Sequence, residues 1–347
     1  MSKPVFPAEW YPHEGVMVTW PHRDSDWAPM LEEVTRCYVD ISKEILRREK
    51  LLALVPPGLD IAPFFTDEER KNLITVVIAS NDTWTRDHGP IILFHDGIPL
   101  VTDFGFNGWG LKFAADRDNR ITRQLFEKGV FDPSATYCNR LNFILEGGSL
   151  ESDGEGTLLT TSACLLAPNR NQPLTQQEIE AALREMLGAD RVLWLNHGHL
   201  AGDDTDSHVD TLARFCATDT IAYVKCDDDT DEHYEALNAM EQELISFVKA
   251  DGEPYRLVSL PMADAVYDED DGRLPATYAN FLILNDVVLV PFYGTKKDEI
   301  ARRQLQQAFP DREVVGVDCA PLIRQHGSLH CITMQLPKGI LVESNKQ

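Results

Sequence analysis

Apolar positions in the first third of the chain follow two spacings. Between residues 27 and 48 they recur every three or four positions, which predicts an amphipathic helix. The apolar positions of this helix are Met30, Leu31, Val34, Tyr38, Ile41, Ile45 and Leu46. Short apolar runs between turn-forming residues predict strands, at residues 16–20, 51–55, 75–79 and 91–94.

Beyond residue 150 the pattern becomes regular. A strand at 157–161 precedes a helix that starts at the capping box Thr175–Glu178 and ends near Gly188. Further strands and helices follow in the same alternation: strands at 191–195, 211–217, 221–225, 255–260, 278–284, 287–290 and 313–317, and helices at 231–250 and 297–309.

The order strand, strand, helix, strand therefore occurs at least twice, at a separation of roughly 65 residues, which is typical of a closed, pseudo-symmetric array of repeated units. No linker rich in Pro, Ser or Gly divides the chain, so we expect one domain over residues 1–347. Polar residues at equivalent strand ends would then converge near the centre of the array.

Composition indicates a soluble, cytoplasmic protein. The chain has 347 residues, 43% of them hydrophobic, and no apolar run approaches the ~20 residues of a membrane-spanning helix. The first residues lack the apolar core of a signal peptide. Seven scattered cysteines, with no Cys-x-x-Cys pair, indicate reduced thiols.

The formal net charge of -24 argues against nucleic acid or an anionic membrane as partner, because both require a basic surface. A negative field would attract a small cationic substrate. Much of the charge lies in runs at 227–229 and 268–271, which are typical of solvated loops, so solubility is the simpler explanation. The composition is compatible with a homo-oligomer.

Cys331 is the candidate nucleophile. It follows the turn-forming pair Gly327-Ser328 and opens an apolar-polar alternation, which predicts a thiol at the mouth of a strand. The thiolate is the reactive form, and a bound guanidinium could help to stabilise it. Composition alone favours a buried structural cysteine. The neighbouring His330 would face away from Cys331 if both were in a strand.

His208 and Asp210 stand two positions apart before the strand at 211–217, so in an extended segment both face the same way. Histidine is the usual general acid and base near neutral pH, and a carboxylate can accept hydrogen bonds from a planar cation. Spacing alone favours a loop histidine bonded to its neighbour.

Two other segments carry candidate binding groups. In the first, Asp87 can bind a guanidinium in bidentate fashion, and Trp84 can cover a flat cation. The alternative is a turn aspartate paired with Arg86. In the second, Glu146 precedes Gly147-Gly148 and could keep His208 protonated, or it could face solvent.

Metal chemistry is the competing interpretation. His197, His199 and His208, with intervening aspartates, form a segment rich in metal ligands, and they would make the protein a metal-dependent hydrolase. A catalytically inactive binding module is a third class.

Four segments together resemble a known family. Residues 81–87, 146–149, 208–210 and 330–333 are similar to motifs of the agmatine deiminases and bacterial-type peptidylarginine deiminases, of the guanidino-group-modifying superfamily. The similarity extends from Pro7 to Cys331. It implies an α/β fold that is a five-bladed pseudo-symmetric propeller of ββαβ units, with no metal and no organic cofactor.

The resemblance also implies roles for the candidates. Cys331 attacks the guanidinium carbon, Asp87 and Asp210 bind its nitrogens, His208 shuttles protons and Glu146 supports His208. The implied activity is hydrolysis of agmatine to N-carbamoylputrescine and ammonia through a covalent thiouronium, as in nucleophilic catalysis.

The substrate is a separate expectation. The second cation of agmatine should meet a carboxylate, for which Asp204 and Asp206 are candidates, and Trp84 and Arg86 complete the expected binding set. A deiminase of peptidyl-arginine or of another guanidine is the alternative. His88 and residues 326–329 depart from the agmatine pattern as we know it and could reshape the pocket.

Overall fold

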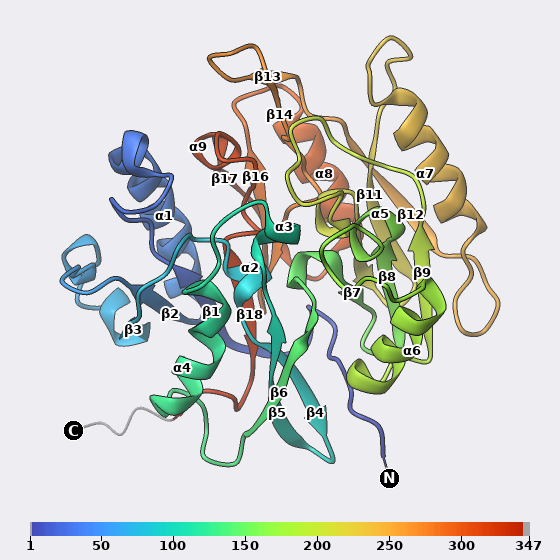
Figure 1. Cartoon of the computed structure of the whole chain (residues 1–347). Helices are drawn as coiled ribbons and strands as arrows, with labels where there is room; N and C mark the ends of the chain where they lie inside the picture. The colour runs from blue at the N-terminus through green and yellow to red at the C-terminus, as the bar shows by residue number, and fades with distance from the viewer. Residues whose placement is uncertain (1, 343–347) are drawn as a thin grey trace.

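The computed structural model describes residues 2–342 as a mixed α/β fold of small sheets, which confirms the α/β class expected from the sequence (Figure 1). Five of these sheets share one pattern, in which an antiparallel pair of strands is extended by a parallel strand. Their strands are β4 (Ile91–His95), β5 (Ile98–Gly105) and β6 (Thr136–Ile144); β7 (Glu151–Ser152), β8 (Thr157–Thr161) and β9 (Arg191–Leu195); β10 (Ala213–Ala217), β11 (Thr220–Lys225) and β12 (Arg256–Pro261); β15 (Leu282–Ile283), β16 (Val287–Phe292) and β17 (Glu313–Asp318); and β18 (Thr333–Pro337), β1 (His13–Thr19), β2 (Lys50–Val55) and β3 (Leu73–Val77).

The last of these sheets joins the two ends of the described chain. Strand β18 pairs antiparallel with β1, from Val18 opposite Thr333 to His13 opposite Pro337. A small separate hairpin pairs β13 (Val266–Tyr267) with β14 (Arg273–Leu274). The sequence pattern predicted at least two repeats. It did not indicate β7, because alternation over two residues cannot reveal so short a strand, whereas β15 lies within the strand predicted at 278–284.

In each of these five sheets an α-helix lies in the connection between the first two parallel strands, because parallel pairing requires a long crossover. These helices are α1 (Leu31–Leu46), α4 (Ile121–Glu127), α6 (Gln176–Leu187), α7 (Tyr234–Ser246) and α8 (Asp298–Ala308). In Figure 1, α1, α4, α6 and α7 lie toward the outside of the molecule. Four short helices complete the described α-helices: α2 (Thr85–His88), α3 (Gly108–Leu111), α5 (Ser162–Leu165) and α9 (Ala320–Ile323).

Local chemistry explains the clearest boundaries. In α6 the hydroxyl of Thr175 accepts a hydrogen bond from the Glu178 amide, and the Glu178 carboxylate accepts one from the Thr175 amide, so the predicted capping box is confirmed. Gly188 ends this helix at φ 73°, a conformation that glycine adopts without strain. Strand β2 is buried along almost its whole length, which explains its uninterrupted apolar sequence.

Within residues 2–342, no helix combines the length and apolar character needed to span a membrane.

Candidate functional site

Five segments that contribute to one site share a position in the fold. Each immediately precedes the first strand of a sheet, and each supplies one polar side chain. Asp87 lies on α2 before β4, Glu146 precedes β7, Asp210 precedes β10, Asn280 precedes β15 and Cys331 precedes β18. We expected polar residues at equivalent strand ends to converge, and contacts among these segments confirm that expectation.

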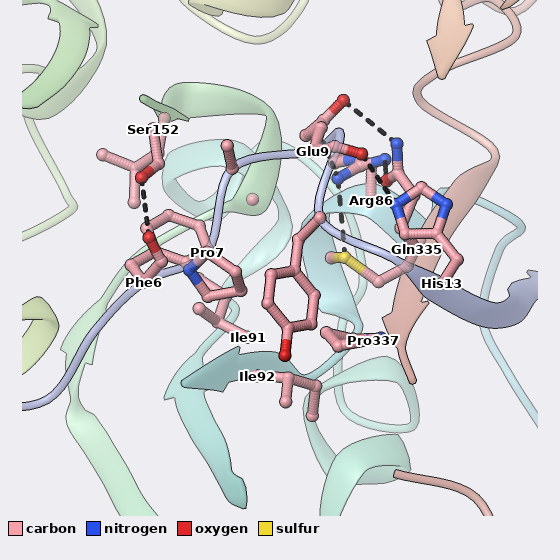
Figure 2. A pocket seen from close by; sticks show the side chains of 15 residues that line it. Phe6, Pro7, Glu9, His13, Arg86, Ile91, Ile92, Ser152, Gln335 and Pro337 are labelled. Atoms are coloured by element: carbon pink, nitrogen blue, oxygen red, sulfur yellow. Dashed lines mark hydrogen bonds and ion pairs between the residues drawn. The ribbon is translucent and has the colours of Figure 1, made fainter. Parts of the chain in front are cut away.

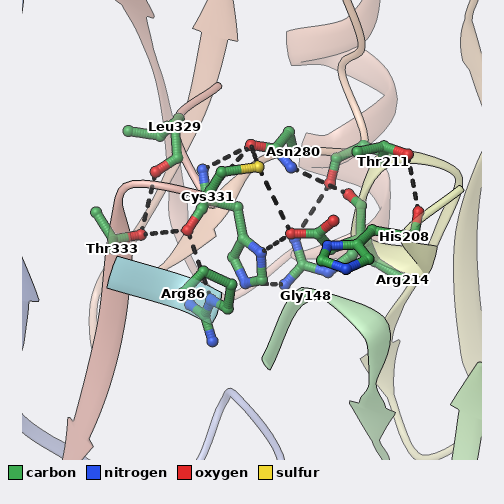
Figure 3. Close-up of polar contacts among 12 residues, drawn as sticks. Arg86, Gly148, His208, Thr211, Arg214, Asn280, Leu329, Cys331 and Thr333 are labelled. Carbon is green, nitrogen blue, oxygen red and sulfur yellow. Dashed lines mark hydrogen bonds and ion pairs between the residues drawn. The ribbon is translucent and has the colours of Figure 1, made fainter. Parts of the chain in front are cut away.

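Cys331 lines a cavity of about 160 Å³ and is itself 5% exposed. The side-chain oxygen of Asn280 accepts hydrogen bonds from the backbone amides of His330 (2.8 Å) and Cys331 (3.2 Å) and lies 3.4 Å from Sγ. Figure 3 shows Asn280 facing the Cys331 sulfur. Because these amides are fixed, the turn that carries the thiol is rigid before any ligand arrives.

The thiol faces anions rather than cations. Sγ of Cys331 lies 3.9 Å from Oδ2 of Asp210. Burial, together with the charges of Asp210 and Asp87, raises the pKa of Cys331 well above its ordinary value. In the empty site the thiol is therefore protonated, and a cation placed between it and the carboxylates would reverse this preference.

The two aspartates have different surroundings. Asp87 accepts hydrogen bonds from Nε1 of Trp109 at Oδ2 and from the Gly148 amide at Oδ1, both at 3.0 Å. Burial and the charge of Asp210 raise the pKa of Asp87 well above its usual range. Burial also acts on Asp210, but the hydrogen bond from His330 and its charge lower the pKa of that carboxyl below its usual value. Asp210 is therefore the more strongly anionic member of the pair.

His208 adjoins both acids. Its Nδ1 lies 3.5 Å from Oδ1 of Asp87, and neither ring nitrogen has a hydrogen-bond partner among residues 2–342. A Cβ added at Gly148 would lie 2.6 Å from Nδ1 of His208, 2.8 Å from Oδ1 of Asp87 and 3.2 Å from Oδ2 of Asp210. Only a glycine fits where these three groups converge. Burial lowers the pKa of His208 to about 3, so the ring is neutral in the empty site.

Glu146 forms its hydrogen bonds with Arg170 and not with His208. Both Glu146 oxygens accept hydrogen bonds from Nε of Arg170, at 3.0 and 3.1 Å, and the two side chains are fully buried. Burial raises the pKa of Glu146, while Arg170 opposes this shift. Glu146 and His208 still place ligand-type atoms within 4.8 Å of each other.

Of the expected binding residues, Trp84 and Asp204 line the cavity. Asp206 is engaged elsewhere, since it accepts hydrogen bonds from Arg170 (2.6 Å) and from Nζ of Lys112 (2.7 Å). Arg86 directs its guanidinium away from the cavity to the carboxylate of Glu9, at 3.0 Å. Arg86 therefore has a structural set of partners, and we omit it from the binding residues.

The cavity wall is acidic and aromatic. Within the described chain, the lining contains no lysine and no arginine. Its acidic members are Asp26, Asp82, Asp87, Asp203 and Asp204, and its aromatic members are Trp84, Trp109 and Phe113. Such a wall suits a flat or extended cation.

The structure does not assemble the metal site considered from the sequence. Two groups of described residues could hold an ion, Glu146 with Cys164 and His208, and Glu9 with Glu151 and His330, and neither contains His197 or His199. Nδ1 of His197 lies 3.0 Å from Glu243 on α7, and the His199 ring packs beside His233. A hydrolase site built on His197, His199 and His208 is therefore wrong for this fold.

Sequence reasoning missed four residues of the site: Asn280, Trp109, Arg170 and His330. The sequence did hold one indication of Asn280: it precedes the first strand of its sheet, as Asp87 and Asp210 do in theirs. His330 was expected to face away, but it lies in a turn before β18, so strand alternation does not apply, and its Nδ1 lies 2.7 Å from Oδ2 of Asp210. No local pattern marks Trp109 or Arg170.

Comparison with known proteins adds independent information. The family model described as Porphyromonas-type peptidyl-arginine deiminase matches residues 5–337. An agmatine deiminase from Pseudomonas aeruginosa is 35% identical over 95% of each chain.

Two solved structures are closely similar. One, from Porphyromonas gingivalis and provisionally described as an arginine deiminase, has 56% identity and a TM-score of 0.94, covering 98% of this chain and all of that one. The other is a cysteine-to-serine variant of the C. jejuni agmatine deiminase with substrate bound, with 40% identity, a TM-score of 0.89 and 97% coverage of both chains.

Proposed function

This chain belongs to the Porphyromonas-type peptidyl-arginine deiminase family, and we propose that it hydrolyses agmatine to N-carbamoylputrescine and ammonia. The observation that carries the proposal is the placement of one thiol, Cys331, opposite two carboxylates in a cavity with an acidic wall. A guanidinium seated there would neutralise the carboxylates and bring its carbon to the sulfur.

The chemistry follows from this arrangement. Binding of the cation favours the thiolate of Cys331, and the thiol proton passes to His208. The sulfur forms a bond to the guanidinium carbon, and the C–N bond breaks as His208 protonates the departing ammonia. The product of this half-reaction is a covalent thiouronium.

Water completes the cycle. Neutral His208 removes a proton from water as the oxygen bonds to the carbon, and the C–S bond then breaks to release the carbamoyl product. The thiol regains its proton from His208. Asp87 and Asp210 hold the remaining nitrogens throughout, and Glu146 stabilises the charged form of His208 by its negative charge. The second proton of this water passes to solvent or to the released ammonia, so that the carbamoyl product leaves neutral at its new oxygen.

The cavity wall favours agmatine over free arginine. The α-carboxylate of arginine would face aspartates, and the described lining offers no lysine or arginine to pair with it. Asp204 lines the cavity with its side chain 43% exposed, and we assign it to the terminal ammonium of agmatine. Trp84 covers the guanidinium or the chain next to it.

We also infer that the five sheets form a closed, five-bladed propeller and that residues 1–347 form a single catalytic domain in the cytoplasm. The pairing of β18 with β1 supports closure, because it joins strands from opposite ends of the described chain.

The decisive assay is ammonia release from agmatine, free arginine, an arginyl peptide and butylguanidine, before and after exhaustive chelation. We expect agmatine to be the best substrate, chelation to have no effect and Cys331→Ala to abolish turnover. A preference for the peptide would establish the alternative substrate class. Thiol-independent turnover, or its loss on chelation, would overturn the mechanism.

Butylguanidine tests Asp204 separately, because it lacks the second cation. Asp204→Asn should raise the KM for agmatine by about tenfold, the effect of losing a charged hydrogen bond, and leave that for butylguanidine unchanged. Equal effects on both substrates would reject this assignment.

A further inference from the structure

Glu9 lies behind the catalytic cavity, in the segment that precedes β1. Its Oε1 lies 2.7 Å from Nε2 of His330 and 3.0 Å from Nη1 of Arg86, and its Oε2 accepts a hydrogen bond from Nε2 of Gln335 at 3.0 Å. Oε2 also accepts one from Arg214. Figure 2 shows Glu9 gathered with Arg86 and Gln335. The Glu9 side chain is 16% exposed, and both of its carboxylate oxygens have polar partners.

A continuous chain of contacts runs from Glu9 into the cavity. His330 is fully buried, with one ring nitrogen 2.7 Å from Glu9 and the other 2.7 Å from Oδ2 of Asp210. This Asp210 oxygen is the one that lies 3.9 Å from Sγ of Cys331. The other, Oδ1, is buried without a hydrogen-bond partner among residues 2–342. His330 thus fixes one oxygen of Asp210 and leaves the second for a ligand.

Charge explains why a carboxylate is needed at the far end. Arg86 and Arg214 are both buried beside His330, and Arg214 lies 3.0 Å from its Nε2. Arg214 has a second anionic partner, Glu151, whereas Glu9 is the anion that Arg86 contacts. Without Glu9, the two buried guanidinium groups would be left with Glu151 alone, and Asp210 is the next anion whose charge acts on Arg214. Buried charge left unpaired in this way is costly.

We propose that Glu9 is a positioning residue that, through His330, holds Asp210 with one carboxylate oxygen directed at the cation that Cys331 attacks. The inference deepens the proposed function and rests on it for the identity of that cation. Its physical basis is preorganisation, since a second layer of hydrogen bonds fixes a group that contacts the substrate. The sequence separation of 321 between Glu9 and His330 explains why no motif indicates this connection.

Two thiol reagents can test this without any turnover. Chloroacetamidine carries a flat cation like the guanidinium head, whereas iodoacetamide is neutral, so the ratio of their rates of Cys331 alkylation reports on the carboxylate clamp. We expect Glu9→Gln to lower the rate with chloroacetamidine by about tenfold, as for the loss of a hydrogen bond to a charged group. The iodoacetamide rate should change far less.

Glu151→Gln is the matched control. It also removes an anionic partner of Arg214, and Glu151 lies within 4.8 Å of His330 but is joined to it by no described hydrogen bond, so the reagent ratio should change far less than in Glu9→Gln. Glu9→Asp retains the charge and should recover part of the ratio, and it serves if Glu9→Gln does not fold. In an Asp210→Asn background, Glu9→Gln should have no further effect on the ratio.

Three results would overturn the inference: an unchanged ratio in both Glu9 variants, equal loss of both reagent rates, or an undiminished effect of Glu9→Gln in the Asp210→Asn background. Ammonia release by the wild-type protein and by Cys331→Ala is measured in parallel. Absence of thiol-dependent release from agmatine would reject the proposed function, while the reagent ratio would still decide the role of Glu9.

Discussion

The sulfur of Cys331 lies 3.9 Å from Oδ2 of Asp210, so the candidate nucleophile is adjacent to a buried carboxylate. An anion at this distance opposes ionisation of a thiol, and Asp87 adds to the effect. The surrounding carboxylates therefore favour the neutral thiol form of Cys331.

Alkylation of Cys331 by neutral iodoacetamide should reveal this suppression. In the free protein the rate should rise with pH to a midpoint above 9.0, the ordinary value for the thiol. Removing one negative charge favours the thiolate, so Asp210→Asn should lower the midpoint by about one unit. Mass spectrometry of the Cys331 peptide measures the reaction, with Cys331→Ala as control. A midpoint below 9.0 in the wild type would contradict the prediction.

Gly148 and Gly147 should respond differently to alanine. The Cβ of Gly148→Ala would meet His208, Asp87 and Asp210, so we expect kcat/KM to fall by about a hundredfold, as for misplaced catalytic groups. The Cβ of Gly147→Ala would lie 2.2 Å from the backbone oxygen of Arg86, which forces the main chain to move.

Gly147→Ala should therefore lower the Tm by several degrees, whereas Gly148→Ala should lower it less. Steady-state kinetics and thermal unfolding separate the two effects. Wild-type kcat/KM in Gly148→Ala would show that the three groups do not act together.

His88 should make the fold sensitive to acid. In the folded protein, burial lowers the pKa of His88 to about 3. In the unfolded chain this burial is lost, and the pKa returns to its ordinary value of 6.5. A group whose folded pKa is depressed resists protonation in the native state, and stability is lost as the pH falls from 6.5 towards 3. At pH 4.5 this amounts to about 2–3 kcal/mol relative to pH 7.

His88→Asn should remove that contribution. Urea unfolding at pH 7 and pH 4.5 gives the loss of unfolding free energy between the two pH values for each protein. The difference between the loss in the wild type and the loss in the variant isolates His88 from the other titrating residues. Identical pH dependence in the two proteins would be the contrary result.

The buried pair of Arg170 and Glu146 gives a fourth prediction. Arg170→Met removes the counter-ion of a fully buried carboxylate, so the free energy of unfolding should fall by about 3 kcal/mol. Arg170→Met combined with Glu146→Gln should recover part of this loss, because the second change removes the unpaired charge. Chemical denaturation of the three variants completes a double-mutant cycle. Strictly additive losses would mean that the two side chains do not interact.

Local features of the sequence determined much of this protein. The helical spacing of residues 27–48 and the capping box at Thr175 predicted helices because they depend on neighbours within one or two turns. The polar motifs around Asp87, Asp210 and Cys331 indicated the candidate site, because the chemistry of a guanidinium requires those groups. The family resemblance rests on the same short segments.

Tertiary structure alone decided which of these groups meet. Arg170 pairs with Glu146, Trp109 with Asp87, and His330 with both Glu9 and Asp210, across separations that local patterns do not encode. Burial, which shifts the pKa values of Cys331 and His208, is likewise a property of the packed molecule. The physical reason is that the energy of a buried charge depends on everything around it, whereas a helix or a turn depends mainly on its own sequence.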